Sequence, residues 1–164
     1  IGIFCSILIS IINSPDVGPV SRAVATFSEV SDTLRTTIIP RFADSILVLE
    51  LTFFWGGAND NSISLFKFFD ITNSTNVNFP TTSLGSRDAC HGAARQKDHD
   101  VNDCDQMHLH TSIVAASTSL RVYTLHEESN QGDGTNTKYF FASASDATPL
   151  GISRPIFKIT EIKQ

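Results

Sequence analysis

Apolar and polar residues alternate with a period of two along much of the chain, and this period predicts β-strands. In ILVLELTFFW, residues 46–55, every odd position from Leu47 to Trp55 is apolar, whereas Glu50 and Thr52 mark the opposite face. Residues 107–116 and the C-terminal segment 156–164 alternate in the same way. Each of these segments predicts a strand with one packed face.

Segments rich in Gly and Asn separate the strand-like segments. GGANDN, residues 56–61, lies between the strand at 46–55 and the strand-like segment 62–70, and ESNQGDGTNT, residues 128–137, precedes KYFFASA. Such clusters are typical of turns between adjacent strands. We therefore expect residues 46–70 to form one hairpin and the chain around 128–137 to form another.

The number and spacing of the strands predict the fold class. Seven to nine short strands, separated by turn signals about 8–12 residues apart, indicate an all-β protein with an antiparallel β-sandwich of the jelly-roll type. Residues 1–40 are predicted as an extended apolar N-terminal arm or as the first strands, and 41–164 as the sandwich domain, with a long loop at 81–106. Residues 21–35 fit either strands or a helix.

Composition narrows the classes of partner. The net charge is −5, and the 12 Lys and Arg residues are dispersed without a basic cluster, so we expect no nucleic-acid binding. The longest apolar stretch, IGIFCSILISII, has 12 residues, whereas a membrane-spanning helix needs about 20. The charged fraction of 18% is below the roughly 25% of an average soluble domain, which predicts a surface that partners cover.

Residues 90–110 concentrate the reactive side chains of the chain. A disulfide between Cys90 and Cys104 would contribute about 3 kcal/mol in an oxidising compartment, and Cys5 would then be a buried thiol. Alternatively, Cys90, Cys104, His108 and His110 supply four ligands of two types, thiolate and imidazole, that Zn²⁺ prefers. The spacing favours the disulfide-closed or free-thiol loop over the metal site, and we expect no cofactor.

Other chemistries have weaker support in the sequence. Asp98, Asp100 and Asn102 alternate like the start of a calcium loop, but the Gly at the sixth position is missing. The chain has no G-x-S-x-G elbow and no Walker loop, so we predict that it is not an enzyme. Trp55 is next to two glycines and is a candidate platform for stacking a sugar ring, although a Trp that completes an alternating apolar face is more often a core residue.

The C-terminal half resembles a known class of proteins. SLRVYTLHEESNQGDGTNTKYFFASA, a Pro-bearing turn and IFKITEIKQ, with Thr160, Glu161 and Ile162 near its end, resemble the closing layout of jelly-roll domains in virion proteins of tailed bacteriophages, such as head-decoration proteins and tail-fibre knobs. The resemblance implies a non-enzymatic structural protein of the virion that forms a homo-oligomer, with a trimer favoured. Its partners would be other virion proteins and a host glycan or receptor.

Two alternatives stay open at this stage. The first is a secreted carbohydrate- or receptor-binding β-sandwich that uses loop 81–106 for recognition, and the second is a small metal-dependent enzyme that uses loop 90–110. In an oligomer, the histidines of this loop predict a pH effect: if they meet at a subunit interface, protonation near their usual pKa of about 6.5 would weaken assembly.

Overall fold

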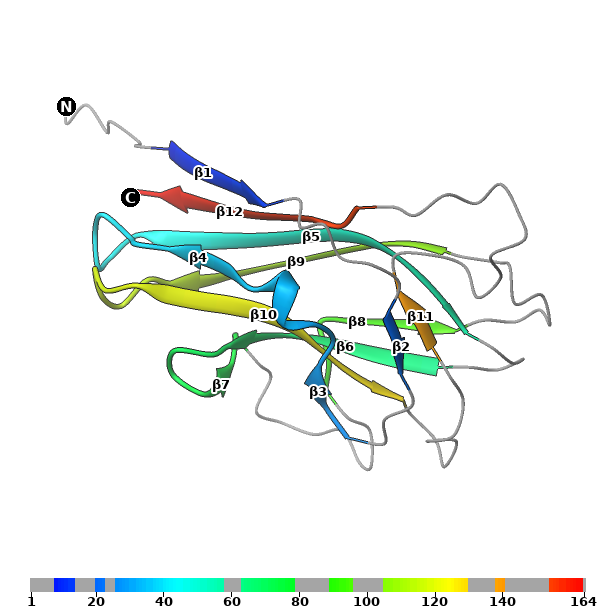
Figure 1. Ribbon diagram of the computed structural model, residues 1–164. Helices are drawn as coiled ribbons and strands as arrows, with labels where there is room; N and C mark the ends of the chain where they lie inside the picture. Colours follow the sequence, from blue (N-terminus) through cyan, green and yellow to red (C-terminus); the bar gives the residue numbers. More distant parts are fainter. Residues whose placement is uncertain are drawn as a thin grey trace.

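The fold is an antiparallel β-sandwich. The computed structural model describes residues 8–13, 20–22, 26–57, 63–78, 89–95, 105–129, 138–140 and 154–163. The strands in these ranges form two sheets that pack face to face (Figure 1). This arrangement confirms the predicted all-β sandwich.

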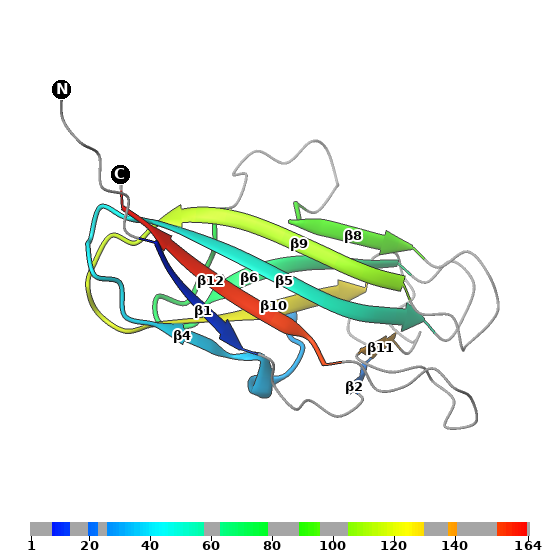
Figure 2. The ribbon, with the colours of Figure 1, turned by 90° about the horizontal axis from the view of Figure 1, so that it is seen from above.

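Sheet A is organised around the long strand β5. The strand β9 pairs along one side of β5, while β12 and β11 share its other side, with β1 outside β12 and β2 outside β11. Figure 2 shows β1, β12, β5 and β9 side by side in that order. The strands of sheet A are β1 (Leu8–Asn13), β2 (Val20–Arg22), β5 (Ile46–Gly57), β9 (Asp105–Val114), β11 (Lys138–Phe140) and β12 (Ile156–Ile162).

Sheet B is organised around the pair β10 and β6. The strands β3 and β4 pair with the outer side of β10, and β7 and β8 pair with the outer side of β6. The strands of sheet B are β3 (Ser28–Glu29), β4 (Thr36–Ile38), β6 (Ile63–Asp70), β7 (Thr75–Asn76), β8 (Gly92–Arg95) and β10 (Arg121–Ser129). All of the pairings in both sheets are antiparallel.

The strand order is that of a jelly roll. Sheet A presents the row β1–β12–β5–β9 and sheet B the facing row β4–β10–β6–β8, and along these eight strands the chain changes sheet at every step except from β6 to β8. Both predicted hairpins are therefore wrong, because β5 and β6 lie in different sheets, as do β10 and β11. Alternation identifies the buried face of each strand, but it does not show whether two consecutive strands pair within one sheet or face each other across the core.

Aromatic rings fill the space between the sheets. The odd-numbered side chains of β5, from Leu47 to Trp55, are at most 1% exposed, as the alternation predicts. From sheet B, the Phe66 ring meets the Phe53 ring edge-on with centroids 5.2 Å apart, and it lies 6.4 Å from the Trp55 ring. The Phe140 ring lies 6.3 Å from both the Phe53 and Phe66 rings. Each fully buried aromatic side chain of this kind contributes roughly 1.5–3 kcal/mol through burial alone.

Two segments differ from their sequence predictions. The described part of 21–35 forms β2, β3 and the single 3₁₀ turn Asp32–Leu34, so the helix alternative is wrong there. Loop 81–106 is interrupted by β8, whose residues Gly92–Arg95 pair with β6. A short strand of small residues lacks an alternating apolar signal, and a Cβ at position 92 would meet the end of the Leu109 side chain, which would have to shift.

Three of the connections that the structure describes gather at one end of the sandwich. These are residues 39–45 between β4 and β5, residues 71–74 between β6 and β7, and residues 115–120 between β9 and β10 (Figure 1). The amides of Ala115 and Ala116 donate to the carbonyls of Ser45 and Ala43, so two of these connections are joined.

Among the described residues, no helix is long and apolar enough to cross a membrane.

Candidate interaction surface

The outer face of sheet A is built from the even-numbered residues of β1, β5, β9 and β12. Besides the pair Phe54 and Gln106, strand register aligns most of these residues in four rows that run across the sheet. We call them the apolar row, the hydroxyl row, the charged row and the histidine row. The apolar row contains Ile162, Ile46 and Val114, and the hydroxyl row contains Ser10, Thr160, Val48 and Ser112. The charged row contains Ile12, Lys158, Glu50 and His110, and the histidine row contains Ile156, Thr52 and His108.

The polar side chains of this face interact across neighbouring strands. The Lys158 ammonium lies 2.9 Å from the Glu50 carboxylate, and the hydroxyls of Ser10 and Thr160 are 2.9 Å apart. Lys158 and Glu50 are each about one third exposed, so water screens their attraction and the pair contributes at most about 1 kcal/mol. These contacts fix the orientations of the side chains on this face more than they stabilise the fold.

Large apolar side chains stand exposed on the same face. Ile12 is 64% exposed, Val114 50% and Ile156 47%, and they lie on β1, β9 and β12. Ile46 and Val48 are half-buried between them. Single exposed apolar residues are ordinary on protein surfaces, but several on one face of a sheet are typical of an interaction site.

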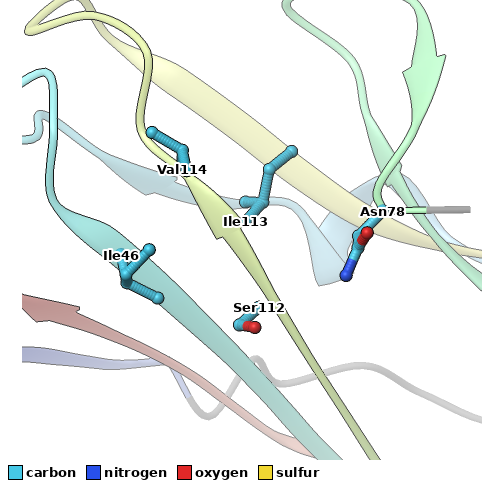
Figure 3. A pocket seen from close by; sticks show the side chains of 5 residues that line it. All are labelled: Ile46, Asn78, Ser112, Ile113 and Val114. Atoms are coloured by element: carbon cyan, nitrogen blue, oxygen red, sulfur yellow. The ribbon is translucent and has the colours of Figure 1, made fainter.

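A shallow pocket adjoins the apolar row. Its volume is about 400 Å³, and it is lined by Ile46, Asn78, Ser112, Ile113 and Val114 (Figure 3). Asn78, which follows β7 of sheet B, has a φ of 38°, a left-handed conformation that Asn tolerates better than most residues. The pocket therefore lies at the β9 edge of the sandwich, where both sheets contribute to it.

The structure separates Cys90 from His108 and His110, the other two predicted zinc ligands within the described residues. His108 and His110 lie together on the outer face of sheet A, with ring centroids 6.4 Å apart. Cys90 precedes β8 in sheet B, and the side chain of Leu109, between the two histidines, points inward against Gly92. The histidines consequently point away from β8. The described residues contain no group of three or more His, Cys, Asp or Glu side chains that could hold a metal ion.

Several predicted residues lie outside the described ranges. They are Cys5, Cys104 and the three calcium candidates Asp98, Asp100 and Asn102. The Cys90–Cys104 disulfide therefore stays a prediction.

Trp55 is a core residue and not a surface platform. Its side chain is 1% exposed, and its indole Nε1 donates to the Ser64 hydroxyl over 2.9 Å. The stacking prediction is wrong for Trp55, because a sugar ring at the surface cannot reach its ring. The Ser64 hydroxyl in turn donates to the buried carboxylate of Glu127 over 2.8 Å, so the indole begins a polar chain inside the sandwich.

A second buried polar group has no counterpart among the sequence predictions. Arg121 donates to the Asp70 carboxylate over 2.5 Å, and both side chains are almost completely buried. Asn73 adds its backbone and side-chain N–H groups to the same carboxylate, at 3.1 and 2.9 Å. Burial raises the pKa of the adjacent Tyr123. Asp70 and Arg121 are 51 positions apart in the sequence, so no local pattern could have paired them.

Glu161 joins the last strand to the connection before β5. Its carboxylate accepts hydrogen bonds from the amides of Arg41, at 2.9 and 3.0 Å, and Phe42, at 3.1 Å. Burial would raise the pKa of Glu161, but the Arg41 amide, the Ser45 hydroxyl and the Phe42 amide together hold it below the usual value. The charged carboxylate of Glu161 therefore anchors β12 to residues 39–45, the connection between β4 and β5.

His91 is a structural histidine between β8 and β6. Its Nδ1 accepts a hydrogen bond from the Phe68 amide over 3.1 Å, and its ring meets the Phe68 ring edge-on at 5.5 Å. Burial lowers the pKa of His91, the Val77 backbone partly opposes this effect, and the Lys67 charge adds to it. His91 is thus held neutral in the fold, and it does not join the histidines of β9.

Comparisons with known proteins give no match in sequence. No protein family matches the chain, and no curated protein has a significantly similar sequence. The class that the observations define is a jelly-roll β-sandwich with a partly apolar outer face.

Proposed function

We propose that this protein is a non-enzymatic structural subunit of a virus particle and that copies of it associate through the outer face of sheet A. The observation that carries the proposal is the exposure of Ile12, Val114 and Ile156 on this one face. Apolar side chains at such exposures lose contact with water when a second copy covers them, and this loss favours association.

The size of the face fits a subunit contact. The strands β1, β5, β9 and β12 contain 6, 12, 10 and 7 residues, and at about 3.3 Å per residue and 4.8 Å between strands they cover roughly 550 Å². A stable interface of standard size buries about 800 Å² on each partner. The face of sheet A, together with part of its rim, is therefore large enough for a specific contact.

The composition of the face also fits a contact between copies. Lys158 and Glu50 form a neutral ion pair at the centre, and the rows on either side contain mainly hydroxyl and apolar side chains. A face with both signs of charge balanced does not repel an identical face. The aromatic core supports this use, because a tightly packed sandwich presents its outer face as a rigid surface.

The virion assignment draws on the fold and on the resemblance of the C-terminal half. Jelly-roll domains build viral capsids and also occur in lectins, so the fold alone does not decide between a shell protein and a glycan-binding module. We favour a capsid-decoration or tail-fibre component that forms a homotrimer, touches other virion proteins and exposes its loops to a host glycan or receptor. The virion is then its location.

Two measurements test this proposal. Native mass spectrometry of the purified protein should give a trimer or a larger ring, and its peptides should be present at fixed stoichiometry in purified virus particles. A monomer at every concentration would contradict the assembly. An oligomer absent from all particles, with specific signals on a glycan array, would favour the secreted carbohydrate-binding alternative.

A further inference from the structure

The exposed pair His108 and His110 is a preorganised arrangement of two imidazoles. Both residues lie on β9, which pairs with β5 from Ile46 to Trp55, so their backbone is held over its whole length. Their rings are 6.4 Å apart between centroids and inclined by 28°. Two positions apart on one strand, they point to the same side of the sheet.

A neighbouring hydroxyl fixes the orientation of one ring. The Thr52 hydroxyl lies 2.9 Å from Nδ1 of His108, directly across from it in the register. When Nδ1–H donates to this oxygen, the lone pair of Nε2 is free, and the ring is in the tautomer that binds a metal ion. A hydrogen bond to the second nitrogen of a ligating histidine is the usual support of such a site.

We propose that His108 and His110 bind one divalent transition-metal ion, Cu²⁺ or Zn²⁺, as a two-histidine chelate on the outer face of sheet A. Neutral imidazole is a preferred ligand of both ions, and water fills the remaining positions. Metal–nitrogen distances of about 2.0–2.1 Å place the ring centres of a tetrahedral site roughly 5 Å apart. Small χ rotations of two exposed side chains close the gap from the observed separation.

The surrounding charges do not oppose a cation. Glu50 lies across from His110 and is paired with Lys158, so the nearest ammonium of the charged row is neutralised. The next outward residues along β9 are Gln106 and Ser112, which carry no charge. The other described histidines lie elsewhere, since His91 packs against Phe68 and His126 stacks on Phe69 in sheet B.

The test is a titration of the whole chain with CuCl₂ or ZnCl₂ alone at pH 7.5, followed by calorimetry and, for Cu²⁺, by electron paramagnetic resonance. It uses a concentration at which the chain is monomeric, so that metal binding and assembly can fail separately. We expect one ion per chain and nitrogen hyperfine structure from two imidazoles. His108→Ala and His110→Ala should each abolish saturable binding, and Thr52→Val should weaken it about 10-fold.

His126→Ala is the matched control, because it removes a histidine from the other sheet and should bind the ion as the wild type does. Circular dichroism melting verifies that the variants are folded, which is expected since both histidines of the pair are exposed. The proposal is overturned if the wild type shows no saturable binding, if both alanine variants of the pair keep it, or if Cys90→Ser removes it while the histidine pair is intact.

Discussion

The two sides of the same strands in sheet A are built differently. Along β5 the inward side chains from Leu47 to Trp55 are all apolar and at most 1% exposed, whereas outward positions such as Glu50 and Thr52 are half-buried and mixed in character. Inward residues meet a fixed partner, the facing sheet. Outward residues have polar cross-strand contacts and leave isoleucines and a valine in water, so the inner side supplies stability and the outer side is the one that we propose for recognition.

The largest effect should come from emptying the inner side. Phe66 contacts both Phe53 and Trp55, so Phe66→Ala leaves a cavity at the centre of the sandwich and should reduce the free energy of unfolding by about 3–5 kcal/mol. The matched control is Phe54→Ala on the outer face, where Phe54 is half-buried and the loss should be less than half as large. Equal losses in urea denaturation would contradict the distinction between the two sides.

A loss nearly as large should follow from breaking the buried ion pair. Arg121→Met leaves the Asp70 carboxylate buried without its cation and should cost about 3–5 kcal/mol. Adding Asp70→Asn should recover part of the loss, because the remaining charge is removed. If the double variant were as unstable as the sum of the single variants, the pair would not be coupled.

A smaller effect is expected at Glu161, which anchors β12 to the connection before β5. Glu161→Gln replaces the charged acceptor of the Arg41 and Phe42 amides and should cost about 1–3 kcal/mol at neutral pH. The lowered pKa means that the stabilisation is present above the unfolded-state value of about 4.3 and is lost as the pH falls through the folded-state value. Denaturation midpoints of the wild type and of Glu161→Gln should therefore converge in acid, and a constant difference would contradict the pKa assignment.

The smallest effect should be the pH dependence due to His91. Because burial lowers its pKa, the unfolded chain binds the proton more readily, so stability is full above about pH 6.5 and falls as the pH drops toward the folded-state value. The slope from this one residue is at most about 1.4 kcal/mol per pH unit. His91→Asn keeps an acceptor near the Phe68 amide and should flatten the stability profile between pH 7 and 5, whereas an unchanged slope would exclude His91 as its source.

The sequence predicted individual strands well, because burial on one side of a strand leaves a period of two. The odd positions of β5 and the outward histidines of β9 follow directly from that period. It could not predict which strands pair, since the aromatic faces of β5 and β6 meet across the core and not within one sheet. Nor did it reveal β8, because the inward residues Gly92 and Ala94 are small, and at Gly92 the Leu109 side chain of the facing sheet takes the space.

The candidate surface was only partly predictable for the same reason. The spacing of His108 and His110 placed them on one side of a strand, but the alignment of Ile12 with Glu50 and His110 depends on β12 pairing between distant segments. The ion pair of Asp70 and Arg121 resembles ordinary surface charge in the sequence. Only the three-dimensional pairing shows that these charges are buried.

The measurement that tests the central claim most directly is sedimentation equilibrium of the wild type, Ile12→Asp and Ile39→Asp over a wide range of concentrations. Ile12 and Ile39 are both 64% exposed, but only Ile12 lies on the outer face of sheet A. We predict that the wild type and Ile39→Asp associate equally and that Ile12→Asp shifts toward the monomer. Equal association of all three proteins, or a wild type that is monomeric throughout, would contradict assembly through this face.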